Sequence, residues 1–206
     1  MYTNDKPMLK KYLFLLVFAF TSILAKAQVT DTVLLARMGD FDLSTLNGDS
    51  YGAVQMGEKI LPDTGKMTPN SRTNFFSKLA KAYDEVDQDS TAIIYYEKVN
   101  AAAPDYFVAQ RALGLLYNEK AEDIQLKLYI TPKDNPNYKP LYSLYEKAVR
   151  KALPHLEKAQ ACDPDDDTLD LIKTLYRNIN DEAGYIAFTK RVPDLAKNCM
   201  DLLEDK

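Results

Sequence analysis

Tryptophan is absent from this sequence of 206 residues, and it holds only one His, two Cys and seven Gly. A single His gives no basis for a Ser/His/Asp or Cys/His catalytic set. No Gly-rich phosphate loop and no cluster of metal-ligating side chains occurs either, so we predict no enzyme, no cofactor and no metal site. Scarce Gly, almost no strand-like alternation and abundant Ala, Leu, Lys, Glu and Tyr predict an all-α fold.

One acidic run invites a metal-site interpretation. Asp163 and residues 165–167 are all Asp, a composition compatible with calcium binding. The run lacks the glycine and the distal Glu of a helix-loop-helix calcium loop. Acids directly before Thr168 are explained more simply as helix caps and partners of the helix dipole. The lone His155 has no ligand at metal-binding spacing, and we assign it no functional role.

Acidic residues outnumber basic ones, 30 to 26. Four of the Lys and only one acid fall in residues 1–27, so the remainder is more acidic still. Because Lys and Arg supply most of the affinity for a phosphate backbone, an acidic chain without basic clusters disfavours nucleic acid as a partner.

The N-terminus has the three parts of a secretory signal peptide. Lys10 and Lys11 precede an apolar run over residues 12–24, and Ala25-Lys26-Ala27 follows. We expect cleavage after Ala27 and export to the periplasm or outside the cell. The alternative is an uncleaved membrane anchor, although the run is short for a bilayer, which needs about 20 apolar residues. No Cys lies near the cleavage point, which disfavours a lipoprotein.

Two interpretations are open for Cys162 and Cys199. In an oxidising compartment the two thiols can pair. Both lie among apolar helical neighbours, however, where unpaired Cys behaves as a small hydrophobic residue. We favour buried, unpaired thiols.

Helix caps and breakers divide the chain into segments. We expect helices at residues 32–38 (ended by Gly39), 50–61, about 71–85 after a cap at Asn70 or Ser71, 90–103 after a cap at Ser90, 106–129 and 141–161, with loops at 62–69 and 131–140.

Two stretches share one spacing of large and small residues. In the first, an aromatic-x2-Leu-Ala-x2-Tyr pattern is followed by Ala-x3-aromatic and then Pro, at Phe76, Leu79, Ala80, Tyr83, Ala92, Tyr96 and Pro104. In the second, Leu113-Gly114-x2-Tyr117 lies 34 residues after its counterpart, and the spacing from Ala92 to Pro104 returns from Ala152 to Pro164. The second copy therefore predicts a helix pair with residues 118–143 inserted between its helices.

A third, weaker copy starts at Leu169, with Lys173 at the small position, Tyr176, and Gly184-x3-Phe188. With these motifs the chain resembles the tetratricopeptide repeat (TPR) family, in the exported bacterial type, over residues 71–188. The resemblance implies a right-handed superhelix of antiparallel helix pairs and a role in protein binding. Within a helical domain at 28–206 we expect units at about 71–104, 105–164 and 165–192, then a C-terminal capping helix at 193–204.

The insertion predicts an elongated hairpin that protrudes from the second unit. Its tip would carry Tyr129, Ile130, Tyr138, Leu141 and Tyr142. An exposed aromatic tip indicates a contact surface, whereas the alternative is that these side chains pack on one another within the hairpin. We favour the packed alternative.

The first helix of each unit would line a concave face. The candidate residues there are Ser77, Lys81, Asp84, Arg111, Leu115 and Asn118. Some TPR proteins hold peptide C-termini with a Lys and Asn clamp on these helices. Ser77 stands where that Lys belongs and Leu115 replaces a polar partner, so the resemblance does not extend to the clamp.

The expected function is an exported scaffold that binds another protein at the cell envelope, through the concave face or the hairpin tip. One rival is an accessory protein that binds glycan or nutrient at the envelope, although such proteins usually carry a lipid-anchored Cys and more Trp. The other rival is a hydrolase that uses paired carboxylates. The sequence names no partner and leaves the oligomeric state open.

Overall fold

The computed structural model describes residues 32–201 and residue 203, and almost all of them lie in helices or short connections. The predicted signal peptide, residues 1–27, lies outside the described residues. The chain divides into two compact units, up to Lys66 and from Met67 onward. None of the helices in the described ranges has the length and apolar character that a membrane span requires.

The first unit opens with a helix over residues 32–46. The expected end of this helix at Gly39 is wrong. Leu34 and Phe41 are both buried and lie seven residues apart, so they occupy one helical face on either side of Gly39. A single Gly inside a helix costs only about 1 kcal/mol relative to Ala, which the buried face offsets.

The helix α2 (Ser50–Ile60) follows as expected, because the Asp49 carboxylate accepts a hydrogen bond from the Gly52 N–H at 2.9 Å. The segment predicted as a loop instead starts with a 3-10 helix, η1 (Leu61–Lys66). Arg37 pairs with Asp63 at 3.2 Å and so ties η1 to the first helix of the unit.

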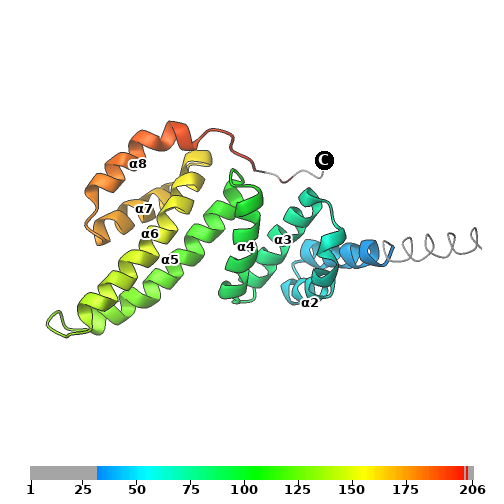
Figure 1. The fold of residues 1–206 in the computed structure, drawn as a ribbon, viewed down its shortest axis with the longest axis horizontal. Coiled ribbons are helices and arrows are strands. Elements are labelled where there is room, and N and C mark those ends of the chain that lie inside the picture. The colour runs from blue at the N-terminus through cyan, green and yellow to red at the C-terminus, as the bar shows by residue number, and fades with distance from the viewer. Residues whose placement is uncertain (1–31, 202, 204–206) are drawn as a thin grey trace, which may run out of the picture. The chain divides into compact units, whose positions relative to one another are not determined.

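The second unit contains three successive helix pairs, and the predicted all-helical fold with adjacent packed helices is confirmed (Figure 1). The pairs are α3 (Pro69–Asp84) with α4 (Asp89–Ala102), α5 (Phe107–Ile130) with α6 (Tyr138–Cys162), and α7 (Asp166–Asn178) with α8 (Glu182–Leu195). The helices α5 and α6 have 24 and 25 residues, whereas α3 and α4 have 16 and 14. The α5–α6 hairpin therefore projects beyond its neighbours.

The helix starts differ in detail from those expected. Thr68, not Asn70 or Ser71, caps α3, and its hydroxyl accepts from the Ser71 N–H at 3.2 Å. Pro69 then occupies the first helical turn, where its missing N–H is not needed. The helix α4 begins at Asp89, and α6 begins at Tyr138 rather than Leu141.

Close contact between α5 and α6 depends on Gly114. A Cβ placed on Gly114 would lie 2.6 Å from the Leu156 side chain and 3.0 Å from its backbone nitrogen. Leu156 is fully buried, as are Leu113 and Leu116 on either side of Gly114 in the sequence. The small residue of the repeat motif thus marks the crossing point of the long hairpin.

The C-terminal capping helix predicted at 193–204 does not exist in the described residues. The helix α8 passes through Pro193 and ends at Leu195, and Asn198 adopts a left-handed backbone with a φ of 57°. The Met200 N–H then donates to the Asp105 carbonyl at 2.8 Å, and the Met200 carbonyl accepts from the Phe107 N–H at 3.1 Å. Residue 200 is therefore paired with the start of α5 and is unavailable for a helix.

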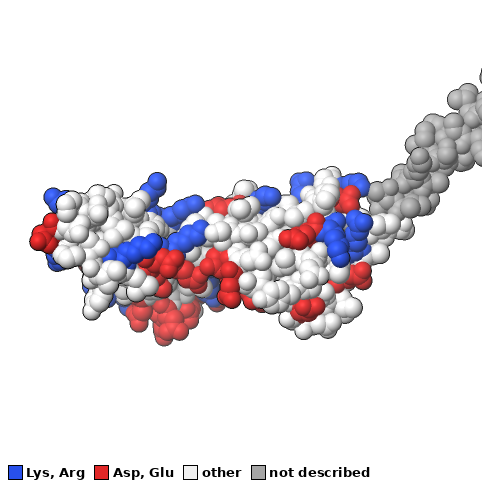
Figure 2. All heavy atoms as spheres, turned by 90° about the horizontal axis from the view of Figure 1, so that it is seen from below, with Lys and Arg blue, Asp and Glu red and all other residues white. Residues whose placement is uncertain are grey.

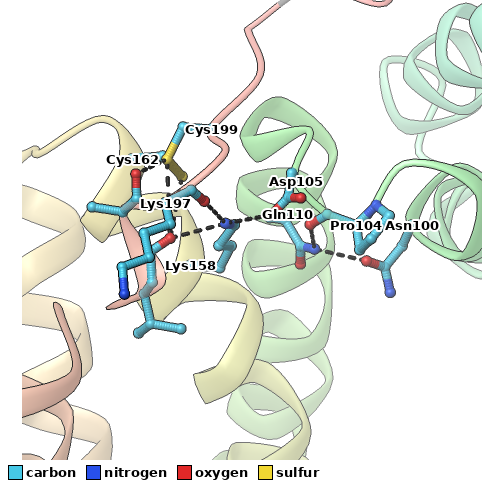
Figure 3. A network of polar contacts seen from close by, with 10 residues as sticks. Asn100, Pro104, Asp105, Gln110, Lys158, Cys162, Lys197 and Cys199 are labelled. Atoms are coloured by element: carbon cyan, nitrogen blue, oxygen red, sulfur yellow. Dashed lines mark hydrogen bonds and ion pairs between the residues drawn. A yellow bond between two sulfur atoms is a disulfide. The ribbon is translucent and has the colours of Figure 1, made fainter. Parts of the chain in front are cut away.

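The prediction of unpaired thiols is also wrong, because Cys162 and Cys199 form a disulfide. Lys158, whose side chain is 12% exposed, adds a polar anchor beside it (Figure 3). Its ammonium contacts Asp105 Oδ1 at 2.7 Å and the carbonyl oxygens of Leu195 and Lys197 at 2.9 and 3.1 Å. The disulfide and the Lys158 ammonium hold the segment after α8 against the end of α6 and the start of α5.

Gly114→Ala should lower the free energy of unfolding of the second unit by about 1–3 kcal/mol, because the new methyl group overpacks the contact with Leu156. Gly39→Ala is the matched control. Nothing lies within 4 Å of its added Cβ, so the same change should stabilise its own helix by about 0.5–1 kcal/mol. Urea unfolding of both variants measures the difference, and equal effects of the two substitutions would contradict the close crossing.

Removal of the disulfide should cost about 2–4 kcal/mol while the helices remain. The double variant Cys162→Ser/Cys199→Ser and the reduced wild-type chain should melt at the same lowered temperature by circular dichroism. Reductant should have no effect on the double variant. An unchanged melting temperature of the wild-type chain in reductant, with free thiols verified by labelling, would refute the stabilising role.

Candidate functional site

The predicted concave-face residues of α3 do not form a set of free ligand-binding groups. Lys81 pairs with Glu85 at 3.6 Å, and Ser77 is half-buried. Burial raises the pKa of Asp84, and the neighbouring acids Asp89, Glu85 and Asp87 raise it further. Acidic side chains also gather in patches on the face drawn in Figure 2. Asp84 itself has the three acids Asp89, Glu85 and Asp87 near it.

The predicted residues of α5 serve mainly internal contacts. Arg111 donates to Asp163 Oδ2 at 2.8 Å and to the Asp163 carbonyl at 2.5 Å, which joins α5 to the end of α6. Asn118 is buried, and its amide donates to Glu122 at 2.7 Å. Leu115, the third concave-face candidate on α5, is an apolar side chain with 42% exposure. Because Asn118 is buried, it does not line an open face as expected.

The tip of the α5–α6 hairpin brings three predicted residues together. Tyr129, Tyr138 and Tyr142 all line one pocket of about 460 Å³, hereafter the tip pocket. The end of α5, the connecting loop, the start of α6 and the end of α7 form it. Its lining residues are Gln125, Leu128, Tyr129, Thr131, Pro132, Lys133, Tyr138, Tyr142, Tyr145 and Asn178. The tip pocket is our candidate site.

Two tyrosines form the fixed part of the tip pocket. The ring centroids of Tyr142 and Tyr145 lie 6.3 Å apart. The Tyr142 hydroxyl donates to the Asn178 carbonyl at 3.2 Å and accepts from the Asn180 amide at 3.1 Å. The Tyr145 hydroxyl accepts from the side-chain amides of Asn178 at 3.1 Å and Gln125 at 3.4 Å. Burial raises the pKa of Tyr145, so this phenol stays protonated at neutral pH.

The outer part of the tip pocket is exposed. Tyr129 is 90% exposed, and its neighbours Ile130 and Leu126 are 78% and 68% exposed. The expectation that the tip side chains pack on one another within the hairpin is wrong for Tyr129, and Tyr142 packs instead on Tyr145, which was not among the expected tip residues. Tyr129 is the last residue but one of α5, which ends at Ile130.

Sequence reasoning missed Gln125, Tyr145 and Asn178. Tyr145 has the helical spacing of the α6 core, so nothing in the pattern set it apart as a pocket residue. Asn178 lies 33 residues further along the chain and reaches the pocket only because α7 packs on α6. No local pattern in the sequence indicates that Asn178 lies close to Tyr145.

His155 lies in a polar joint away from the tip pocket. The Gln110 side-chain amide donates to Asn100 Oδ1 at 2.7 Å and to the Pro104 carbonyl at 2.6 Å. Its oxygen therefore faces His155 Nδ1 at 2.6 Å, which assigns the proton to Nδ1. The His155 ring also stacks on Tyr117 at 5.8 Å. These contacts join α4, α5 and α6, a structural role.

Among the described residues, no group of three or more His, Cys, Asp or Glu side chains is placed to hold a metal ion. Asp165 caps α7, because it accepts from the Thr168 N–H at 2.8 Å and from its hydroxyl at 2.6 Å, while Asp166 and Asp167 lie in the first helical turn. The pKa of Asp165 is lowered, first by the hydrogen bond from the Thr168 side chain.

No protein-family model matches this chain, and a search of curated protein sequences gives no significant match.

The stability of the fold should fall more steeply with acid when His155 is present. Burial lowers the pKa of folded His155, while Glu97 raises it and Lys151 lowers it. In the unfolded chain the pKa of His155 is about 6.5, so as the pH falls the unfolded state binds a proton before the folded state does. The folded state therefore loses stability below that pH.

His155→Gln keeps an N–H donor for Gln110 but cannot titrate. Urea unfolding at pH 7.5 should show the variant less stable than wild type by about 1 kcal/mol. At pH 5 the difference in free energy of unfolding between wild type and variant should become smaller or change sign. A gap of the same size at both pH values would show that His155 does not carry the effect.

Proposed function

We propose that this chain is an exported helical-repeat scaffold of the tetratricopeptide type that binds another protein through the tip of its α5–α6 hairpin. The observation that carries the binding site is the tip pocket with its exposed aromatic and aliphatic rim. Tyr129, Ile130 and Leu126 expose apolar side chains side by side on the last turns of α5. Such a patch beside a pocket is typical of an interaction surface.

Repeated turn geometry supports the repeat part of the proposal. The α3–α4 turn places Asp87 at a φ of 58°, and the α7–α8 turn places Asn180 at 55°. In each turn the next residue donates its N–H to the carbonyl of the motif tyrosine, at 2.9 Å for Tyr83 and 2.9 Å for Tyr176. Two turns with one bonding pattern, in phase with the sequence motif, favour copies of one unit.

The second helices of the first two pairs end alike. Ala103 and Asp163 have φ values of −140° and −141°, and each directly precedes a proline. Each N–H closes the last turn on the residue four before, at 2.7 and 2.9 Å. Because a residue before proline avoids the helical region, Pro104 and Pro164 set both ends.

Ring contacts follow the same phase. Tyr83 stacks on Tyr95 with centroids 5.6 Å apart, and Tyr117 stacks on His155 at 5.8 Å. Tyr117 corresponds to Tyr83 of the first copy, and His155 corresponds to Tyr95, because each follows the small residue of its second helix by three positions. A matching stack between the two helices of each pair supports a shared repeat origin.

The disulfide supports the export part of the proposal. Disulfides persist in oxidising compartments and are rare in reducing ones. The Cys162–Cys199 bond, together with the signal-like segment at residues 1–27, therefore fits a chain that works in a periplasm or outside the cell.

Site-specific photo-crosslinking tests the binding site. The tagged full chain, expressed in its own cell, carries a photoreactive amino acid at Ile130 or, as control, at Leu46, which is 84% exposed. We expect a discrete protein adduct from position 130 and none from position 46. Tyr129→Ala should reduce that adduct several-fold, because aromatic rings dominate contact energies.

Tyr51→Ala is the matched control for Tyr129→Ala, since Tyr51 is 70% exposed and does not line the tip pocket. It should leave the adduct unchanged. Equal adducts from positions 46 and 130, or no adduct at 130, would overturn the proposed site.

A further inference from the structure

The fixed tyrosines of the tip pocket offer ring surface more than polar groups. The Tyr142 hydroxyl donates to the Asn178 carbonyl and accepts from Asn180, so its hydrogen is not free for a ligand. Tyr145 is only 3% exposed and its oxygen already accepts from two amides, so it offers a ligand little ring surface and no free acceptor. A ligand on this floor therefore meets mainly the ring of Tyr142, which is half-buried.

The remaining polar groups of the tip pocket are rich in donors. Lys133 brings an ammonium with three N–H donors, and Tyr129, Thr131 and Tyr138 bring three hydroxyls. No Asp or Glu is among the lining residues. The pocket suits a ligand that supplies hydrogen-bond acceptors and flat apolar rings but few donors of its own.

We infer that the tip pocket binds an extended, proline-rich segment of the partner protein, an inference that rests on the proposed protein-binding function. Proline has no N–H to satisfy, and its carbonyls are acceptors for the Lys133 and tyrosine donors. Its rings pack on aromatic faces, as in other aromatic-lined grooves that take polyproline II segments. That conformation is already extended in the free peptide, so little entropy is lost on binding.

A neutral glycan matches the tip pocket less well. Sugar rings also stack on aromatic faces, but every sugar hydroxyl brings a donor as well as an acceptor. Without a carboxylate in the lining, the side-chain acceptors for those donors are neutral hydroxyl oxygens and the amide oxygens of Gln125 and Asn178. The Lys133 ammonium, which can only donate, has no use for a sugar donor, so the balance of groups favours the proline segment.

Isothermal titration of the full-length protein with a synthetic decaproline tests the inference. A Gly-Ser peptide of the same length controls for any extended chain, and a neutral hexasaccharide represents the glycan class. We expect saturable binding of decaproline and none of the other two probes. Binding of the hexasaccharide without decaproline, or equal binding of the Gly-Ser peptide, would overturn the proline assignment.

Variants locate the binding. Tyr129→Ala and Tyr138→Ala each remove one ring at the pocket and should weaken decaproline binding ~3- to 10-fold. Tyr51→Ala should leave it unchanged. If both pocket variants are folded by circular dichroism and bind decaproline with unaltered affinity, decaproline does not bind in the tip pocket and the inference is wrong.

The failure of the inference is distinguishable from the failure of the proposed function. If decaproline does not bind but the adduct at position 130 forms and depends on Tyr129, the tip still binds a protein and only the ligand class is wrong. If the adduct at position 130 is absent, the protein-binding proposal itself fails. Mapping the cross-linked peptide by mass spectrometry adds a direct check, since the partner's segment should contain several prolines.

Discussion

The close crossing of α5 and α6 at Gly114 is the constraint on which the second unit depends. Leu156 fills the space that any larger residue at position 114 would take, and its own burial is complete. Two long helices fixed at this point must continue side by side to their common tip. The tip projects because both helices extend well beyond this crossing, α5 as far as Ile130 and α6 from Tyr138.

Polar contacts between pairs then fix the hairpin on both sides. Gln110 and His155 join it to the end of α4, where the Gln110 amide reaches the Pro104 carbonyl. On the other side, Glu157 of α6 is buried, accepts a hydrogen bond from Tyr176 and pairs with Arg191 at 2.8 Å. Burial raises the pKa of Glu157, while those two partners act against that rise. A buried carboxylate with two partners gives this interface one well-defined register.

The sequence predicted those parts of the fold that depend on local periodicity. The spacing of Tyr83, Tyr117 and Tyr176 marks the helix pairs, and the turn-rich segment after Tyr129 marks the hairpin tip. Caps were harder to place because several polar residues near Thr68 compete for one role. The long first helix was missed for the reason that a buried face, set by partners distant in sequence, outweighs the cost of one Gly.

The disulfide and the floor of the tip pocket needed the tertiary structure. Cys162 and Cys199 have apolar neighbours that fit a buried thiol equally well, and their approach depends on the left-handed Asn198 and the pairing of Met200. Asn178 reaches Tyr145 in the same non-local manner. Periodicity identifies the face of a helix on which a residue lies, but not which distant segment covers that face.

The tip pocket is coupled to the helix pair that follows it, α7 and α8. Asn180 holds its left-handed backbone in the α7–α8 turn, and its side chain contacts the Tyr142 hydroxyl. The same hydroxyl donates to the carbonyl of Asn178, a group that the end of α7 leaves without a helical partner. The floor of the pocket is therefore as rigid as that turn. A ligand that stacks on Tyr142 contacts a surface held in place by two helix pairs, and it need not order the hairpin tip by itself.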